Sequence, residues 1–317
     1  MLPRESPTGT EQVTLPAFLQ QCVLGLTSGG FLGLIAVGYT LVYGTVGLIH
    51  FAHGDVVMLG GCLAVGLLSL LAPFAFDPLV GWLMIVLVTI SCGFFCGGLN
   101  MAIDRLVYRP LRQAPPLAPL VSAVGVSFIL MNVGLLWLGS TDQAFPDLVT
   151  NAGSPALRSP VTMADLVVLS LVLPALIGLA ILLQRTRFGR SLRSVAAVSR
   201  VTTPTGGADQ FISATFFLGG FLGGVASVAA SIHTATINYQ MGYQTGLYAL
   251  AAAVLGGIGS VPGAIVGGLL VGLIRAFSTV VLGPRWAAAA VFLVLIVILA
   301  FRPEGLFGQK RRERRPA

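Results

Sequence analysis

Two histidines and an aspartate near residue 50 form the group of side chains with the clearest capacity for chemistry. His50, His53 and Asp55 lie within six residues of one another. Imidazole and carboxylate groups can bind a metal ion or relay protons. The sequence has no HExxH or GxSxG pattern that would supply catalytic partners. We therefore predict no catalytic residue and no metal site, and interpret the three side chains as structural or as lining a path.

ATP hydrolysis by this chain is excluded by its lysine content. A P-loop needs a lysine followed by serine or threonine, because the amine contacts the phosphates and the hydroxyl binds magnesium. Lys310 is the only lysine, and Arg311 follows it. We expect no enzyme activity and no cofactor, so any ATP-driven step must occur on a partner.

The composition places these residues in a membrane protein. Of 317 residues, 56% are hydrophobic and 9% are charged, with a mean hydropathy of +0.92. A soluble domain carries about 25% charged residues. The net charge of +7 does not indicate nucleic-acid binding, because most arginines follow apolar runs, as the positive-inside rule describes. The sequence predicts one all-α, polytopic membrane domain over residues 1–317.

Charge-free runs set the number of spans. The 43 residues between Glu11 and Asp55 would form a helix about 65 Å long, twice the ~30 Å hydrocarbon core. This segment must break, and the glycine-rich stretch 44–54 is the expected place. The 65 residues between Asp209 and Arg275 require two or three passes. With the remaining runs, at about 80–103, 117–138, 163–184 and 285–301, we expect eight spans and one short or re-entrant helix.

Breaks and polar segments give the chain its expected organisation. Further breaks are expected at 238–246 and at 256–264, and the similarity of 53–67 to 262–273 suggests an inverted repeat. Interrupted helices of this kind mark substrate paths in transporters. We expect an N-terminal tail over 1–14, with the N-terminus outside. A long inward loop is expected over 185–209, and a basic inward tail, which could also contact membrane lipid, over 303–317.

Three stretches resemble a known family. GYTLVYGTVGLIHFAHGDVVMLGG (38–61) is similar to the signature of branched-chain amino acid ABC permeases, AAAVLGGIGSVPGAIVGGLLVG (251–272) to their second signature, and FRPEGLFG (301–308) to their C-terminal one. Urea and short-amide importers share these signatures. The resemblance implies a permease subunit of the bacterial inner membrane. It also implies ATP-binding subunits, a second homologous permease and a periplasmic or extracellular substrate-binding protein as partners.

The resemblance and the breaks together give candidate site residues. Helix starts expose unpaired N–H groups that suit a substrate carboxylate or carbonyl oxygen. We expect the two principal breaks to line the substrate path, through His50, His53, Gly54, Asp55, Gly256, Gly257, Gly259, Pro262 and Gly263. The family resemblance implies that the loop 187–211 couples to the ATPase, through Arg190, Arg193, Ala196, Arg200 and Gly206.

Two other functions stay open at this stage. A stand-alone secondary transporter or channel would need a buried charge relay, for which Asp55 and Arg275 are the candidates. A subunit that only assembles is the other alternative, since VSRVTTPTGG (198–207) departs from the family pattern and Pro204 would end a helix early. Asp104, next to Arg105 at the end of a span, is expected at the membrane interface.

Overall fold

The computed structural model describes residues 15–115, 117–146, 161–186, 189–190 and 206–308. Eight helices in this part of the chain are long and apolar enough to span a membrane. They are α1 (Leu15–Val46), α2 (His53–Leu71), α3 (Pro78–Ile103), α5 (Leu117–Leu138), α6 (Met163–Arg185), α8 (Gly206–Thr234), α10 (Val261–Val281) and α11 (Pro284–Phe301). The shorter α9 (Met241–Gly256) completes the set. The predicted all-α polytopic fold, with eight spans and one short helix, is confirmed.

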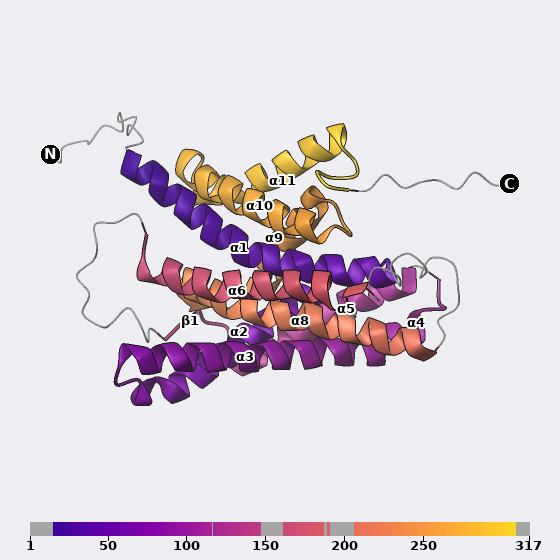
Figure 1. Ribbon diagram of the computed structural model, residues 1–317, viewed down its shortest axis with the longest axis horizontal. Helices are drawn as coiled ribbons and strands as arrows, with labels where there is room; N and C mark the ends of the chain where they lie inside the picture. The colour runs from indigo at the N-terminus through magenta and orange to yellow at the C-terminus, as the bar shows by residue number, and fades with distance from the viewer. Residues whose placement is uncertain (1–14, 116, 147–160, 187–188, 191–205, 309–317) are drawn as a thin grey trace.

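The bundle has two distinct ends (Figure 1). At one end, β1 (Gln143–Ala144) pairs antiparallel with β2 (Thr236–Ile237) and joins the segments that follow α5 and α8; we call this the β end. At the opposite end, α3 continues through one π-helical turn, η2 (Asp104–Tyr108), into the short α4 (Arg109–Leu111). We call this the basic end, because it carries the arginines that follow α3. A short 3-10 turn, η1 (Ala72–Phe74), ends α2.

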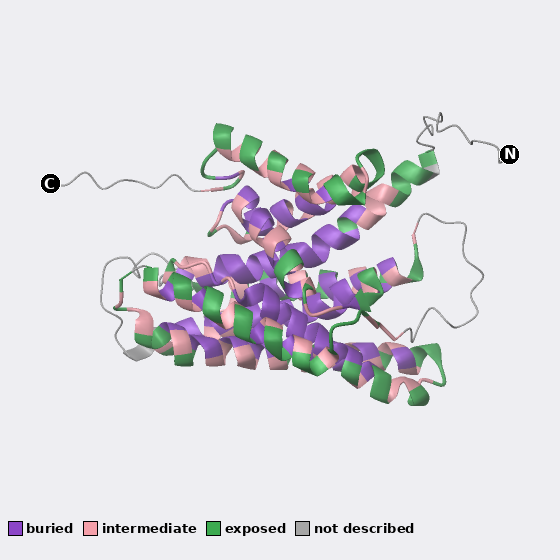
Figure 2. Cartoon of the chain, turned by 180° about the vertical axis from the view of Figure 1, so that it is seen from behind, coloured by how far each residue is buried: buried purple, intermediate pink, exposed green. Residues whose placement is uncertain are grey.

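Glycines bring two pairs of helices into backbone contact. A β-carbon on Gly29 of α1 would lie 2.9 Å from the Gly268 carbonyl oxygen of α10. A β-carbon on Gly220 of α8 would lie 2.7 Å from the Asn100 β-carbon of α3. Real side chains do not approach so closely, so only glycine permits this packing, as is common in membrane bundles. The most buried residues lie along these contacts, at the centre of the bundle (Figure 2).

The helix contacts repeat in inverted order. Helix α1 packs on α10 in the same way that α8 packs on α3. Helix α2 packs on α8 in the same way that α9 packs on α1. Helix α6 contacts both α1 and α8. The unit α1–α2–α3–α5 thus corresponds to α8–α9–α10–α11, with each helix running the opposite way. The sequence comparison matched 53–67 with 262–273 instead. Because 262–273 belong to α10, whose packing position is that of α3, this match does not follow the structural repeat.

Helices α2 and α9 both begin inside the bundle. The His53 ring, in the first residue of α2, lies against Gly38 of α1 and Gly223 of α8. Gly38 precedes the end of α1 by eight residues, which is about 12 Å of helix. The connection 47–52 therefore leaves α1 at the basic end and returns into the bundle before α2 starts. Since α9 contacts the first turn of α2, its own N-terminus lies at a similar depth.

The end of α9 is completed by residues near the C-terminus. The amide N–H of Leu306 donates to the Leu255 carbonyl oxygen at 2.9 Å, and that of Phe307 donates to the Gly256 carbonyl oxygen at 2.9 Å. The last carbonyl groups of a helix have no partner within it. Leu306 and Phe307, which belong to the third signature (301–308), therefore satisfy the end of α9 within the second signature.

Candidate functional site

The first turns of α2 and α9 meet at two glycines. A β-carbon on Gly54 would collide with the Gly242 carbonyl oxygen and would lie 2.8 Å from the Gly246 α-carbon. A β-carbon on Gly242 would lie 2.8 Å from the Met58 β-carbon. In the inverted repeat, Gly54 corresponds to Gly242 and Met58 to Gly246, so these contacts are equivalent. The first turns of two helices, each with a partial positive charge, thus lie side by side inside the bundle.

Asp55 supplies the carboxylate at this junction. Its Oδ2 accepts a hydrogen bond from the Ser127 hydroxyl of α5. Its Oδ1 has no hydrogen-bond partner, although the residue is only 2% exposed. The same oxygen would lie 2.8 Å from a β-carbon on Gly242. A carboxylate next to helix N-termini is favourable, but a buried oxygen without a donor is not.

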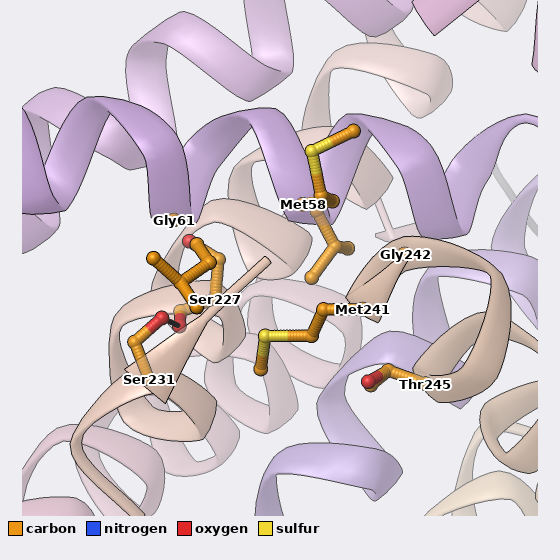
Figure 3. Close-up of a pocket in the computed structure, with 9 residues that line it drawn as sticks. Met58, Gly61, Ser227, Ser231, Met241, Gly242 and Thr245 are labelled. Carbon is orange, nitrogen blue, oxygen red and sulfur yellow. Dashed lines mark hydrogen bonds between the residues drawn. The ribbon is translucent and has the colours of Figure 1, made fainter. Parts of the chain in front are cut away.

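A small pocket opens beside the junction (Figure 3). Met58 of α2 and Met241 of α9 both line it, and Thr245 lies one turn farther along α9. The hydroxyls of Ser227 and Ser231 donate to carbonyl oxygens of their own helix, α8. The polar groups of the two serines are therefore satisfied locally, and the pocket wall is largely apolar. Its full lining is Val57, Met58, Gly61, Ser227, Ser231, Ile237, Met241, Gly242 and Thr245.

His50 is held by a buried network in the connection before α2. Its Nε2 lies 2.6 Å from the Asn100 Oδ1, and its Nδ1 lies 2.7 Å from the Tyr108 hydroxyl. The Asn100 amide nitrogen donates to the Phe216 carbonyl oxygen at 2.8 Å. Asn100 Oδ1 must accept, so the His50 Nε2 carries the proton and the Tyr108 hydroxyl donates to Nδ1. Both ring nitrogens are occupied, which gives His50 a role in fixing the connection.

His53 occupies a different environment, between α1 and α8. It is fully buried, and neither ring nitrogen makes a hydrogen bond of normal geometry, although the Ile35 carbonyl is near enough to interact. The ring packs edge-on to Tyr39, with an angle of 73° between the rings and ring centres 4.9 Å apart. Within the described residues, no three His, Cys, Asp or Glu side chains come together as potential metal ligands. The structure therefore brings His53, Gly54 and Asp55 to the junction and places His50 behind it.

The second predicted break lies at the other end of α9. Gly256 follows Gly242 by 14 residues, about 21 Å along the helix. Gly256 and Gly263 pack backbone to backbone, and a β-carbon on Gly263 would lie 3.1 Å from that of Phe307. Gly257 and Gly259 have φ values of 103° and 97°, which favour glycine, and Pro262 occupies the first turn of α10. The structure thus does not bring the two breaks together: they lie at opposite ends of one short helix.

The predicted coupling residues are only partly described. Arg190 is exposed at the basic end, and Gly206 begins α8. Arg193, Ala196 and Arg200 lie outside the described residues.

An ion-pair cluster around the buried Asp104, at the foot of α8, was missed by the sequence analysis. Arg112 lies between Asp104, at 2.8 Å, and Asp209, with which it also pairs closely. Arg109 contacts Asp209 at 2.9 Å, and the Ser213 hydroxyl donates to Asp104 at 2.5 Å. Asp104, which was expected at the membrane interface beside Arg105, is fully buried between Arg112 and Ser213 of α8; its depth in the membrane stays a prediction. This cluster joins the end of α3 to the first turn of α8.

Comparison with known proteins adds the family. Residues 22–300 match the family described as the permease component of the branched-chain amino acid transport system. The chain is 36% identical over 307 residues to the high-affinity branched-chain amino acid transport system permease protein BraD of Pseudomonas aeruginosa. The aligned residues make up 94% of this chain and 98% of that protein. It is 34% identical over 302 residues to the permease protein LivH of the corresponding Escherichia coli system, covering 94% and 97%. No solved structure matches.

The residues that match this family lie in both halves of the inverted repeat, from α1 to α11. Its residues include the α2–α9 junction, the pocket and the ion-pair cluster. This chain belongs to the family of permease components of branched-chain amino acid transport systems.

Proposed function

We propose that this chain is the membrane-spanning permease subunit of an ATP-driven importer in the bacterial inner membrane. Its substrate is a branched-chain amino acid or a related small polar solute such as urea or an amide. Family membership supports this proposal. The structural observation that carries it is the meeting of α2 and α9, whose N-termini lie inside the bundle next to a buried carboxylate. Interrupted helices with inward N-termini are the usual substrate sites of membrane transporters.

The substrate path runs along α9. It begins at the junction of Gly54, Asp55 and Gly242 and extends toward the basic end past Gly256 and Gly263. A path between these points accommodates both predicted breaks, which lie about 21 Å apart. The first-turn N–H groups of α2 and α9 provide donors for a substrate carboxylate or carbonyl oxygen.

ATP hydrolysis on a separate subunit drives the substrate along this path. The importer contains ATP-binding subunits, a second homologous permease and a substrate-binding protein on the opposite side of the membrane. The loop 185–209 contacts the ATPase, and its motion reaches the bundle through Asp209 and Arg112, which link α8 to the end of α3. Alternating access follows when the two permeases move against each other.

Copurification tests the assembly. The chain is tagged in its native host and extracted in mild detergent, and the bound proteins are identified. Recovery of a P-loop ATPase and a second permease is expected. A chain recovered alone under several extraction conditions would favour the stand-alone transporter instead.

Cysteine accessibility tests the path. Cys22, Cys62, Cys92 and Cys96 are replaced first, and single cysteines are placed at Ser127 and Thr245, which border the junction. We expect a hydrophilic thiol reagent to label them in one nucleotide state and not in the other, with protection by substrate. Val168→Cys, fully buried on α6 and away from the path, is the control and should stay unlabelled. Equal labelling of Ser127→Cys and Thr245→Cys in both nucleotide states, without protection by substrate, would contradict the path.

A further inference from the structure

Asp55 differs from the other buried carboxylates that the structure describes. Asp104 is paired with Arg112. Asp165 is bonded to Thr162 at the start of α6 and lies 4.0 Å from the His233 ring. Asp55 is equally buried, yet its only described partner is the neutral Ser127 hydroxyl, and one of its oxygens has no partner at all. An uncompensated carboxylate inside a membrane bundle is costly and marks a functional position.

A cation with hydrogen-bond donors would meet both needs of the buried Asp55 carboxylate. Asp55 Oδ1 needs a donor, and a positive charge would compensate the carboxylate. Among the described residues, no Lys, Arg or His side chain forms an ion pair with it. An ammonium group meets both needs, because it is positively charged and carries three N–H donors.

The pocket beside Asp55 has the chemistry to hold an aliphatic group. Gly242 lies against Asp55 and also lines the pocket. Val57, Ile237 and the two methionines supply the apolar wall. Met58 and Met241 are unbranched and flexible, so they can rotate to admit a side chain of variable shape. The N-terminus of α9, which begins at Met241 in the pocket wall, carries a partial positive charge that suits a carboxylate.

We propose that Asp55 binds the ammonium group of a small aliphatic amino acid at the α2–α9 junction, with the substrate side chain between Met58 and Met241. This inference rests on the proposed function and assigns the substrate-recognising residue within it. Asp55 then acts as a second filter, after the substrate-binding protein, that admits zwitterionic solutes and retards neutral amides and anions.

The test uses the complete importer in proteoliposomes. Asp55→Asn keeps the size and the hydrogen-bonding capacity of the side chain but removes its charge. We expect ATP-driven leucine uptake to fall at least about tenfold, the range typical for removing one partner of a buried charge pair. ATP hydrolysis stimulated by the loaded binding protein should change by less than about twofold, because Asp55 lies away from the cluster at the foot of α8. Asp55→Glu should retain most of the uptake.

Thermal stability separates recognition from a structural role. Removing an uncompensated buried charge should leave the melting temperature in detergent unchanged or higher. A lower melting temperature, with loss of assembly, would instead make Asp55 a helix-capping residue and overturn the proposal. Wild-type uptake by Asp55→Asn would overturn it as well. Uptake that requires sodium in the wild type, and loses only that requirement in Asp55→Asn, would assign the site to an inorganic cation and would also overturn it.

A second measurement does not depend on transport. In a cysteine-free background carrying Thr245→Cys, a cationic methanethiosulfonate should react about tenfold faster than an anionic one, because the Asp55 carboxylate attracts the first and repels the second. Adding Asp55→Asn should bring the two rates close together. If the wild-type importer shows no ATP-driven uptake, the proposed function fails, and this ratio still decides whether Asp55 selects cations. Equal rates with Asp55 present would overturn the inference.

Discussion

Gly54 of α2 and Gly242 of α9 face each other so closely that neither position has room for a β-carbon. They occupy equivalent places in the two inverted halves, in the first turns of α2 and α9. The contact brings two partial positive charges together, and Asp55 lies at the same point. The helix junction and the carboxylate beside it therefore form one structural unit.

Substitution at the junction should destabilise the protein. Gly54→Ala places a methyl group against the Gly242 backbone, which cannot give way as a flexible side chain would. We expect a loss of about 1–3 kcal/mol, measured as a lower melting temperature of the purified protein in detergent. Gly66→Ala is the matched control, because Gly66 lies on the same helix with open space around its β-carbon position. Equal melting temperatures for the two variants would contradict the close contact.

The hydrogen bonds of His50 should contribute measurably to stability. Tyr108→Phe removes the hydroxyl 2.7 Å from the His50 Nδ1 and leaves that nitrogen buried without a partner. We expect destabilisation of about 1–3 kcal/mol. A double-mutant cycle with His50→Phe measures the coupling, because Tyr108→Phe should cost much less once the imidazole is absent. Additive effects would show that the two side chains do not interact.

Arg112 should matter far more than its neighbour Arg105. Arg112→Ala leaves the fully buried Asp104 without a counter-ion, and breaking a buried pair in this way costs about 3–5 kcal/mol. Arg105→Ala removes an exposed arginine that follows Asp104 directly in the sequence, and it should have little effect on the melting temperature. Adding Asp104→Asn to Arg112→Ala should recover part of the loss. Similar melting temperatures for the two arginine variants would argue against the cluster.

The C-terminal signature should be required up to residue 308 and not beyond. A chain ending after 301 loses the N–H groups that bond Leu255 and Gly256. We expect it to melt at a lower temperature, and hydrogen exchange near the end of α9 to accelerate. A chain ending after 308 keeps both bonds and serves as the control. If both truncations behave alike, the two hydrogen bonds do not stabilise α9.

Most of the helix pattern was predictable because charge-free length constrains it. A 43-residue run could not remain one span, and the structure ends α1 at Val46 and begins α2 at His53, inside the glycine-rich stretch. The spans expected at about 117–138 and 285–301 are observed as Leu117–Leu138 and Pro284–Phe301. Glycine and proline positions determined these boundaries.

Contacts between distant residues were not predictable from one sequence. Arg112 and Asp209 are 97 residues apart, and Asp104 pairs with Arg112 rather than with the adjacent Arg105. The repeat was matched wrongly for a related reason. Similar glycine spacing in 53–67 and 262–273 reflects close packing, which α2 and α10 both need, and does not identify equivalent positions.

The order of helices has a consequence for biosynthesis. Helix α1 enters the membrane first, but it packs through its glycines on α10, which is among the last to be made. The end of α9 likewise waits for Leu306 and Phe307. Neither contact can form during most of translation, so the first span must remain in lipid, incompletely packed, until the chain is nearly complete. Assembly of the core is thus a late, concerted event, and a prematurely terminated chain leaves its glycine-lined surface exposed to membrane quality control.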